Sequence, residues 1–400
     1  MDKKALNYTC LFGGGAIRGA AYVGAIKAMN ELEIDPKNIA GSSVGALVAG
    51  LLAVGYGYQE MSDIFLDVNF DLFKDIQFGL GPNFALSKGE YFLEWVRELI
   101  ERKFYGEDYE KGKNRAVTFK DLDKNLTIFT TNISNFSCQE FSKITTPDFE
   151  IATAVRISST MPGLMKPYEY NNTLLVDGDL QKSMPMWKLS DNLVNSDERI
   201  LEFRLEGDYT GNDRNAIDYI NTVYSCITSI CTDFIVYLYG SKDKYDYVTI
   251  NTGDIVIVDF NCPKEIREKL MESGYLQTIN YFRKFLPEKK ENLLNKYYSL
   301  ERSVKKVVKL IESNKIPKAR FVLSDMFVEL CDYKDVIDEN IYTKLRSFST
   351  LLNDNVKYPP LFGKVSLKNP DLVKSELNSV LEDLSSKVYE LESYLVGFSI

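Results

Sequence analysis

Gly41-Ser42-Ser43-Val44-Gly45 fits the pattern G-x-S-x-G and lies between a predicted strand and a predicted apolar helix. This is the setting of a nucleophile elbow, in which a sharp turn holds the central serine in a strained conformation. Gly41 and Gly45 would leave room for that turn. Ser43 would then stand at a helix N-terminus, where developing negative charge is favoured. The segment therefore predicts a serine nucleophile.

A serine nucleophile needs a base, and none of the 400 residues is a histidine. This excludes a Ser-His-Asp triad, a Cys-His dyad and every site with a histidine metal ligand. Asp177 is the candidate base, because it follows the apolar segment 174–176 and precedes Gly178, at the expected edge of a sheet. The alternative is that this Asp-Gly pair only forms a turn.

A glycine loop precedes the elbow in the sequence. Gly14–Gly19 nearly fits the dinucleotide pattern G-x-G-x-x-G, but Ala16 replaces the middle glycine, and no acidic residue ends the second predicted strand. We therefore favour an oxyanion hole made by the N–H groups of Gly14, Gly15 and Ala16 over a nucleotide site. Arg18 has two interpretations, since it could attract a phosphate head group or fix the loop through a salt bridge.

The predicted elements surround these segments with a parallel sheet. Strands are expected at 7–12 and 38–41, and apolar helices at 16–32 and 45–54. This alternation is typical of a parallel sheet with helices on both faces. Further expected elements are a helix at 88–104 and strands at 126–132, 173–176, 200–205, 248–250 and 254–259.

Four segments together resemble the patatin-like phospholipases. They are GGAIRGAAYVGAI, GSSVG, AVRISSTMPG and VDGD, in this order, within residues 7–195, and the resemblance extends more thinly to about residue 285. It implies a three-layer α/β/α fold with a mainly parallel sheet. It also implies a lipid acyl hydrolase domain over 1–285, a phospholipase A that cleaves acyl esters of phospholipids or lysophospholipids without a cofactor.

The resemblance assigns a role to each matching residue. Ser43 matches the nucleophile and Asp177 the aspartate of a Ser-Asp dyad. The oxyanion loop matches Gly14, Gly15 and Ala16, with Arg18 in its basic position and Gly19 at its end. The two glycines of the elbow match Gly41 and Gly45. An acyltransferase with the same acyl-enzyme and a catalytically silent lipid-binding module remain as alternatives.

Two positions depart from the family pattern. Ala16 stands where the family usually has a third glycine, so the loop must accommodate a Cβ. Asp179 stands where the family commonly has Gly or Ala, and its carboxylate would either raise the pKa of Asp177 or face solvent. An aspartate with an ordinary pKa of about 3.9 is a feeble base, so we expect burial to raise the pKa of Asp177.

Residues 286–400 lie outside the resemblance and show helical heptads at 293–311 and 373–395. Asn369 is a plausible N-cap with Pro370 at the first helical position. The region is expected to form a helical bundle that caps or regulates the domain, or alternatively a surface for homo-oligomerisation. An apolar stripe in 215–239 predicts a core or lid helix, or a surface that enters a lipid interface.

Charge and composition limit the partners. A net charge of −9 argues against nucleic acid and against docking on anionic lipid by bulk charge. Six scattered cysteines fit reduced thiols better than disulfides. The chain contains neither a signal-peptide core near residue 1 nor 18 uninterrupted apolar residues. We therefore expect a cytoplasmic protein that contacts membranes transiently when active.

Overall fold

The protein is described by a computed structural model, which covers the following residues: 8–68, 85, 87–180, 199–207, 219, 222–224, 226–228, 230, 234, 243–253, 255, 262–334, 336–359 and 363–398. The chain divides into two compact units, one of residues 2–240 and 244–281, the other of residues 241–243 and 282–400. The predicted boundary between residues 285 and 286 lies a few residues after this division. The expected strand at 254–259 falls almost wholly outside the described residues.

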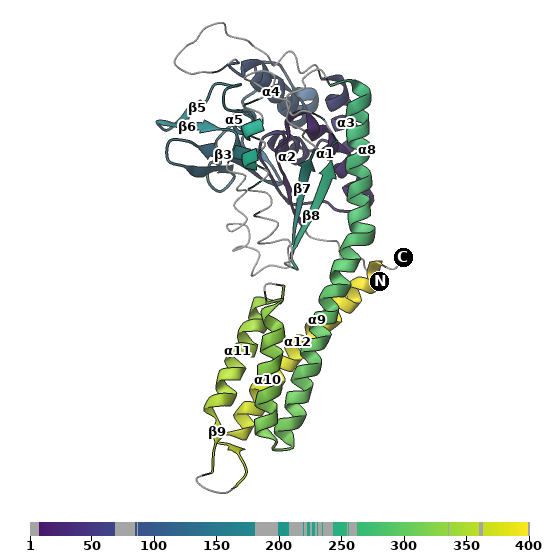
Figure 1. The fold of residues 1–400 in the computed structure, drawn as a ribbon. Coiled ribbons are helices and arrows are strands. Elements are labelled where there is room, and N and C mark those ends of the chain that lie inside the picture. The colour runs from purple at the N-terminus through teal and green to yellow at the C-terminus, as the bar shows by residue number, and fades with distance from the viewer. Residues whose placement is uncertain are drawn as a thin grey trace. The chain divides into compact units, whose positions relative to one another are not determined.

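A mixed, mainly parallel sheet forms the centre of the first unit (Figure 1). Its strands follow the order β5-β6-β3-β2-β1-β7-β8, with β4 paired to β3. The pairs among β1, β2, β3, β7 and β8 are parallel, and those with β4, β5 and β6 are antiparallel. The strands are β1 (Tyr8–Phe12), β2 (Asn38–Gly41), β3 (Asn125–Asn132), β4 (Ser137–Ser142), β5 (Tyr168–Tyr170), β6 (Thr173–Val176), β7 (Arg199–Glu206) and β8 (Tyr245–Asn251).

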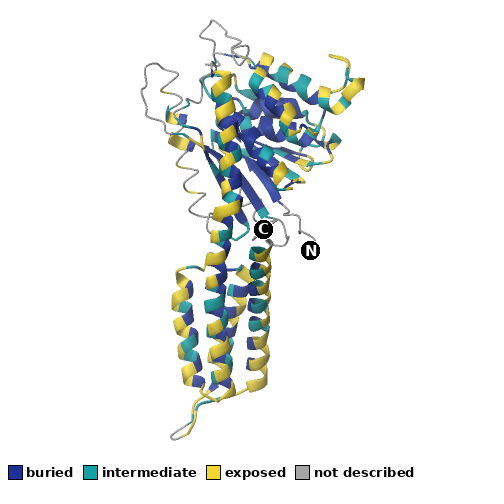
Figure 2. Ribbon diagram, turned by 90° about the vertical axis from the view of Figure 1, so that its right-hand side faces the viewer, coloured by how far each residue is buried: buried dark blue, intermediate teal, exposed yellow. Residues whose placement is uncertain are grey.

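Both faces of the central strands are buried (Figure 2). On one face, the ring of Phe12 stacks on that of Phe203 at 5.1 Å between centroids. Neighbouring positions point to the opposite face, where Leu11 and Ile200 belong to another buried cluster. A parallel sheet that is covered on both sides has such continuous apolar strands. The expected three-layer α/β fold with a mainly parallel sheet is therefore confirmed.

Helices alternate with these strands, and α8 follows the last of them. They are α1 (Ala20–Glu31), α2 (Val44–Val54), α3 (Tyr58–Asp67), α4 (Glu90–Tyr105), α5 (Ile151–Ser158) and α8 (Lys264–Asn280). Shorter helical segments are Ala16–Gly19, Gly106–Asp108, Phe119–Asp121, Gly178–Leu180 and Tyr281–Phe285. Three of the helices, α3, α5 and α8, were not expected from the sequence. Of these, α5 contains the first half of the AVRISSTMPG segment, residues 154–158.

The helices α1 and α8 touch backbone to backbone. A Cβ atom on Gly24 would lie 1.7 Å from the carbonyl oxygen of Met271, and one on Gly274 would lie 1.9 Å from that of Ala21. Neither contact is possible for a real side chain. Glycine is required at both positions so that the two helices can approach this closely.

We expect Gly24→Ala to lower the free energy of unfolding by about 2–3 kcal/mol, because the helices must separate to accept the methyl group. Gly50→Ala in α2 is the matched control. Its Cβ would lie 3.4 Å from Val155 Cγ2, so alanine should be neutral or stabilise by up to about 1 kcal/mol. Urea denaturation measures both variants. Equal changes would contradict the close-contact argument.

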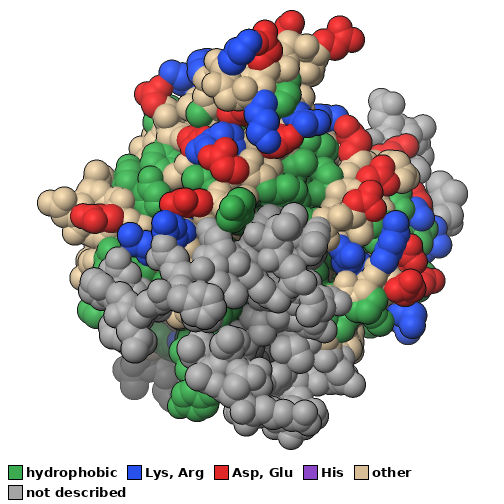
Figure 3. Space-filling view, turned by 90° about the horizontal axis from the view of Figure 1, so that it is seen from above, with side chains coloured by type: hydrophobic (Ala, Val, Ile, Leu, Met, Phe, Trp, Pro, Cys, Tyr) green, Lys and Arg blue, Asp and Glu red, His purple; other side chains and the backbone are tan. Residues whose placement is uncertain are grey.

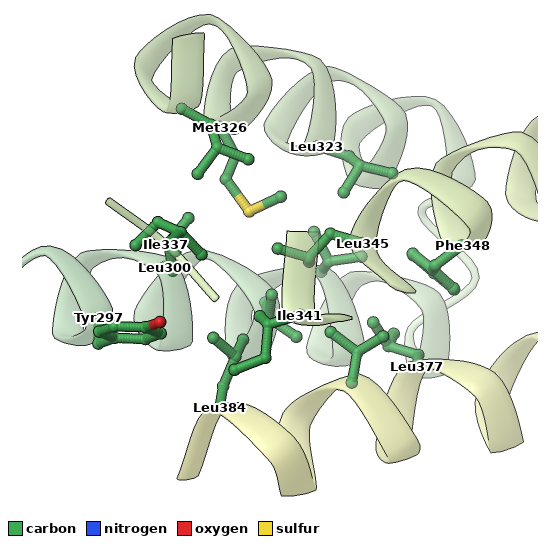
Figure 4. Packing of buried hydrophobic residues seen from close by; sticks show 14 of the residues in the cluster. Tyr297, Leu300, Leu323, Met326, Ile337, Ile341, Leu345, Phe348, Leu377 and Leu384 are labelled. Carbon is green, nitrogen blue, oxygen red and sulfur yellow. The ribbon is translucent and has the colours of Figure 1, made fainter. Parts of the chain in front are cut away.

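The second unit is a helical bundle. It comprises α9 (Leu286–Glu312), α10 (Ile316–Cys331), α11 (Glu339–Asp354) and α12 (Pro370–Phe398), with the short strands β9 (Val356–Lys357) and β10 (Ser366–Leu367). Leu300 and Val304 of the first heptad and Leu377 and Leu384 of the second all lie in its core (Figure 4). The Asn369 side chain accepts a hydrogen bond from the N–H of Leu372, as an N-cap should.

Both heptad seams are thus used within one chain. Since their apolar residues form the core of the bundle, they are not available to a second copy. Homo-oligomerisation remains a prediction, and it would have to use other residues.

Candidate active site

Ser43 lies at the junction of β2 and α2 with φ 54° and ψ −129°. Such a conformation is rare for a non-glycine residue and costs about 1–3 kcal/mol, so the surrounding structure must hold it. The Ser43 N–H donates to Ser158 Oγ at 2.9 Å, and the Ser158 hydroxyl donates to the carbonyl of Phe129 at 2.6 Å. The Ser159 hydroxyl donates to the Ser43 carbonyl at 3.3 Å. Two serines of α5 and its C-terminus therefore brace the elbow.

The glycines of the elbow lie against backbone atoms. A Cβ on Gly45 would lie 2.0 Å from the Phe12 carbonyl oxygen, and one on Gly41 would lie 2.2 Å from the Gly45 carbonyl oxygen. Both positions therefore exclude every other residue type unless the turn itself moves. The sequence pattern predicted this lack of space.

The structure brings Ser43 and Asp177 together, although they lie 134 positions apart in the sequence. The Ser43 hydroxyl donates to Asp177 Oδ2 at 2.8 Å. Asp177 directly follows β6 and is 1% exposed. Its other oxygen, Oδ1, accepts hydrogen bonds from the Asp179 N–H and from the Tyr224 hydroxyl, each at 2.8 Å. The carboxylate is therefore held by three donors from three parts of the chain.

Burial raises the pKa of Asp177 to about 7, and the negative charge of Asp179 adds to the rise. The hydrogen bonds from the Asp179 N–H, Ser43 and Tyr224 act in the opposite direction, because they favour the charged form. The direction is the one expected from the sequence. A carboxylate with such a pKa can accept and return a proton near neutral pH.

Asp179 does not face solvent. It is 4% exposed, and its Oδ1 accepts hydrogen bonds from the Gly14 N–H at 3.1 Å and from the Ser42 hydroxyl at 2.9 Å. This corrects one expectation for the glycine loop. The Gly14 N–H is already used by a carboxylate, so it is not free to point at a substrate oxygen. Asp179 instead joins the loop to the elbow.

The remaining N–H groups of the loop are those of Gly15 and Ala16, and neither has a hydrogen-bond partner among the described residues. Ala16 has φ 48°, a left-handed conformation that suits glycine and costs alanine about 1–2 kcal/mol. The Arg18 side chain donates to the Gly15 carbonyl at 3.4 Å. Gly19 packs on α2, where a Cβ would lie 2.3 Å from Val44 Cγ2. Of the two interpretations of Arg18, the hydrogen bond to Gly15 favours the one in which Arg18 supports the loop.

Tyr224 was not expected at the site. Tyr224 belongs to the apolar stripe of 215–239, and its spacing there gives no sign of a polar contact. In the structure it is buried beside Met161, with Ala16, Leu164 and Leu180 packed around the pair. The only available signal was a single hydroxyl within an otherwise apolar stripe.

Most described neighbours of Tyr224 in that stripe are exposed. Exposed fractions of 40–64% are found for Val223, Ile227, Ile230 and Phe234. The expectation of a core helix is therefore wrong for these residues. Ile220, Cys231, Ile235 and Leu238 of the same stripe lie outside the described residues.

Comparisons with known proteins identify a family for the sequence that contains this site. The sequence profile of the patatin-like phospholipases matches residues 11–189, which include Ser43 and Asp177. Uncharacterized protein R571 of Acanthamoeba polyphaga mimivirus is 32% identical over 278 residues, which cover 65% of this chain and 89% of that protein. Probable lipid hydrolase 463L of Invertebrate iridescent virus 6 is 29% identical over 192 residues, 44% of this chain and 61% of that protein.

Among solved structures, VipD from Legionella pneumophila aligns with 98% of this chain and 90% of its own, at 14% identity and a TM-score of 0.47. The family assignment depends on the sequence matches rather than on this alignment. The profile covers both motif segments, and the mimivirus relative is matched over most of its length. The chain belongs to the patatin-like phospholipase family.

Proposed function

We propose that this patatin-like lipid hydrolase is a phospholipase A that cleaves fatty acyl esters of phospholipids or lysophospholipids through Ser43 and Asp177. The observation that carries the proposal is the 2.8 Å hydrogen bond from Ser43 Oγ to a buried aspartate in a chain without histidine. A nucleophile within hydrogen-bond reach of a base, which is oriented by further groups, is the arrangement that acyl transfer requires.

The chemistry takes place in two halves. Asp177 Oδ2 accepts the Ser43 proton as Oγ attacks the ester carbonyl, and the protonated Asp177 then gives that proton to the leaving alcohol. An acyl-enzyme remains on Ser43. Water, activated by the same carboxylate, attacks the acyl-enzyme, and the fatty acid leaves as Ser43 regains its proton.

The tetrahedral intermediate of each half carries an oxyanion that needs hydrogen-bond donors. In our proposal the N–H groups of Gly15 and Ala16 supply them, and the positive end of α2 at Ser43 adds to the stabilisation. Gly14 contributes only indirectly, because its N–H holds Asp179. The oxyanion hole therefore uses two of the three N–H groups that the glycine loop suggested.

The experiment is incubation of the wild-type protein with mixed phospholipids and lysophospholipids, followed by lipid mass analysis, in parallel with labelling by a fluorophosphonate probe. Ser43→Ala is the matched variant for both measurements. We expect fatty-acid release and labelling in the wild type and neither in Ser43→Ala. Equal release by both proteins would refute the proposal. Transfer of acyl groups to added glycerol in preference to water would identify the acyltransferase alternative.

We also propose transient contact with a lipid surface. No helix in the described part of the chain is both long and apolar enough to span a bilayer. On the face drawn in Figure 3, basic and acidic side chains are interspersed. Exposed apolar side chains are our candidates for this contact, because Ile230 and Phe234 are each more than 60% exposed.

Binding to phosphatidylcholine vesicles tests this surface, because such lipid carries no net charge. We expect the double variant Ile230→Asp and Phe234→Asp to co-sediment with the vesicles at least about tenfold less than the wild type. Labelling of Ser43 by the soluble fluorophosphonate probe should persist in this variant. Unchanged co-sedimentation would refute the proposed contact.

A further inference from the structure

Tyr224 contacts Asp177, although it lies outside the family motifs in the sequence. Its hydroxyl donates to Asp177 Oδ1 at 2.8 Å, and its side chain is 7% exposed. Burial raises the pKa of Tyr224 well above its ordinary value, and the charge of Asp177 adds to the rise. The hydroxyl therefore keeps its proton and acts as a donor throughout the working pH range.

The two oxygens of Asp177 have different surroundings. Oδ1 accepts from the Asp179 N–H and from Tyr224, which uses both of its lone pairs. A proton placed on Oδ1 would face one of these donors and break its hydrogen bond. Oδ2 accepts only from Ser43 among the described residues and can take a proton without such a loss.

We propose that Tyr224 is a positioning residue, which fills Asp177 Oδ1 so that Oδ2 alone exchanges protons with Ser43. The inference rests on the proposed function, because it concerns the same dyad. The ring of Tyr224 packs against Met161, next to Ala16 of the glycine loop. Tyr224 therefore joins the base to the substrate side of the site, and the family motifs do not include it.

Tyr224 and Asp179 act on Asp177 with opposite signs. The hydrogen bond from Tyr224 lowers the pKa of Asp177, whereas the charge of Asp179 raises it. On the far side of Asp179, Arg18 of the glycine loop and Tyr22 of α1 are its charged and titratable neighbours. Removing the Tyr224 hydroxyl should therefore raise the pKa of Asp177, and neutralising Asp179 should lower it.

The test compares kcat against pH for hydrolysis of a lysophospholipid by the wild type, Tyr224→Phe, Asp179→Asn and the control Tyr105→Phe. We expect Tyr224→Phe to move the acid limb up by about one pH unit, so that kcat at pH 6 falls about tenfold while KM changes little. Asp179→Asn should move the limb down, because it removes the negative charge that raises the pKa of Asp177. Its amide oxygen can still accept from Gly14 and Ser42, so the loop should keep its place. Tyr105 lies at the end of α4, and its hydroxyl donates to the Arg115 carbonyl, so its loss should leave the limb unchanged.

The outcomes separate this inference from the proposed function. The role of Tyr224 alone would be overturned if the wild type were active, Ser43→Ala were inactive, and the acid limb of a folded Tyr224→Phe stayed at the wild-type pH. A downward shift in Tyr224→Phe would overturn it as well. A wild-type rate equal to that of Ser43→Ala would overturn both proposals. Circular dichroism and thermal melting identify a variant that lost its fold, and in that case Tyr224→Leu, which is smaller and has no hydrogen-bond donor on its side chain, provides the same comparison.

Discussion

Replacing Asp177 by asparagine should lower kcat for phospholipid hydrolysis by at least about 10⁴-fold. The amide has the shape of the carboxylate, and its oxygen can still accept from the Asp179 N–H and from Tyr224. It offers no basic site on the side of Ser43, however, so the serine proton has no acceptor. Initial rates on a lysophospholipid measure the loss.

The two members of a dyad act as one unit, so their losses should not add. We expect the double variant Ser43→Ala and Asp177→Asn to be no slower than Ser43→Ala alone. Asp35→Asn is the matched control, because Asp35 is 86% exposed and pairs with Lys124 on the surface. A residual rate in Asp177→Asn within tenfold of the wild type would show that another group acts as the base.

The same Asp177→Asn variant should be more stable than the wild type above neutral pH, by about 4 kcal/mol. The pKa of Asp177 is about 7 in the folded protein, compared with an ordinary value of 3.8. Between these values the unfolded chain releases the proton while the folded protein keeps it, so the wild type loses stability as pH rises. Below pH 3.8 both states are protonated, and above pH 7 the loss is complete.

Urea denaturation of both proteins at several pH values measures this difference. The gap in free energy of unfolding should be smallest near pH 4, should widen up to pH 7, and should then stay constant. Parallel curves across this range would show that burial of Asp177 carries no such cost. A gain in stability combined with a loss of activity is common where a buried charge serves catalysis.

The sequence predicted those parts of the site that depend on local backbone geometry. Gly41 and Gly45 predicted the turn, and in the structure a Cβ at either position would meet the backbone. The strands β2 and β6 have the expected bounds. The burial that raises the pKa of Asp177 was also expected, because an aspartate with an ordinary pKa would be a feeble base. These features depend on short segments whose residue types leave few alternatives.

Contacts between distant segments could not be predicted in this way. Asp179 had two possible surroundings, and only the packed structure places it against Gly14 and Ser42. Tyr224 belongs to an apolar stripe by spacing, and periodicity does not tell which member turns toward a carboxylate. The serine of α5 that braces the elbow, Ser158, gave no signal beyond its place in a family motif.

The distances along the chain between the members of the site have a consequence for folding. The glycine loop and Ser43 are synthesised within the first fifty residues, whereas Asp177 follows more than a hundred residues later and Tyr224 later still. Loop closure over such separations is slow compared with local helix formation. A nascent or truncated chain that ends before Asp177 therefore carries the nucleophile without its base. If the proposed dyad is the catalytic one, lipolytic activity is therefore among the last properties that the domain acquires as it folds.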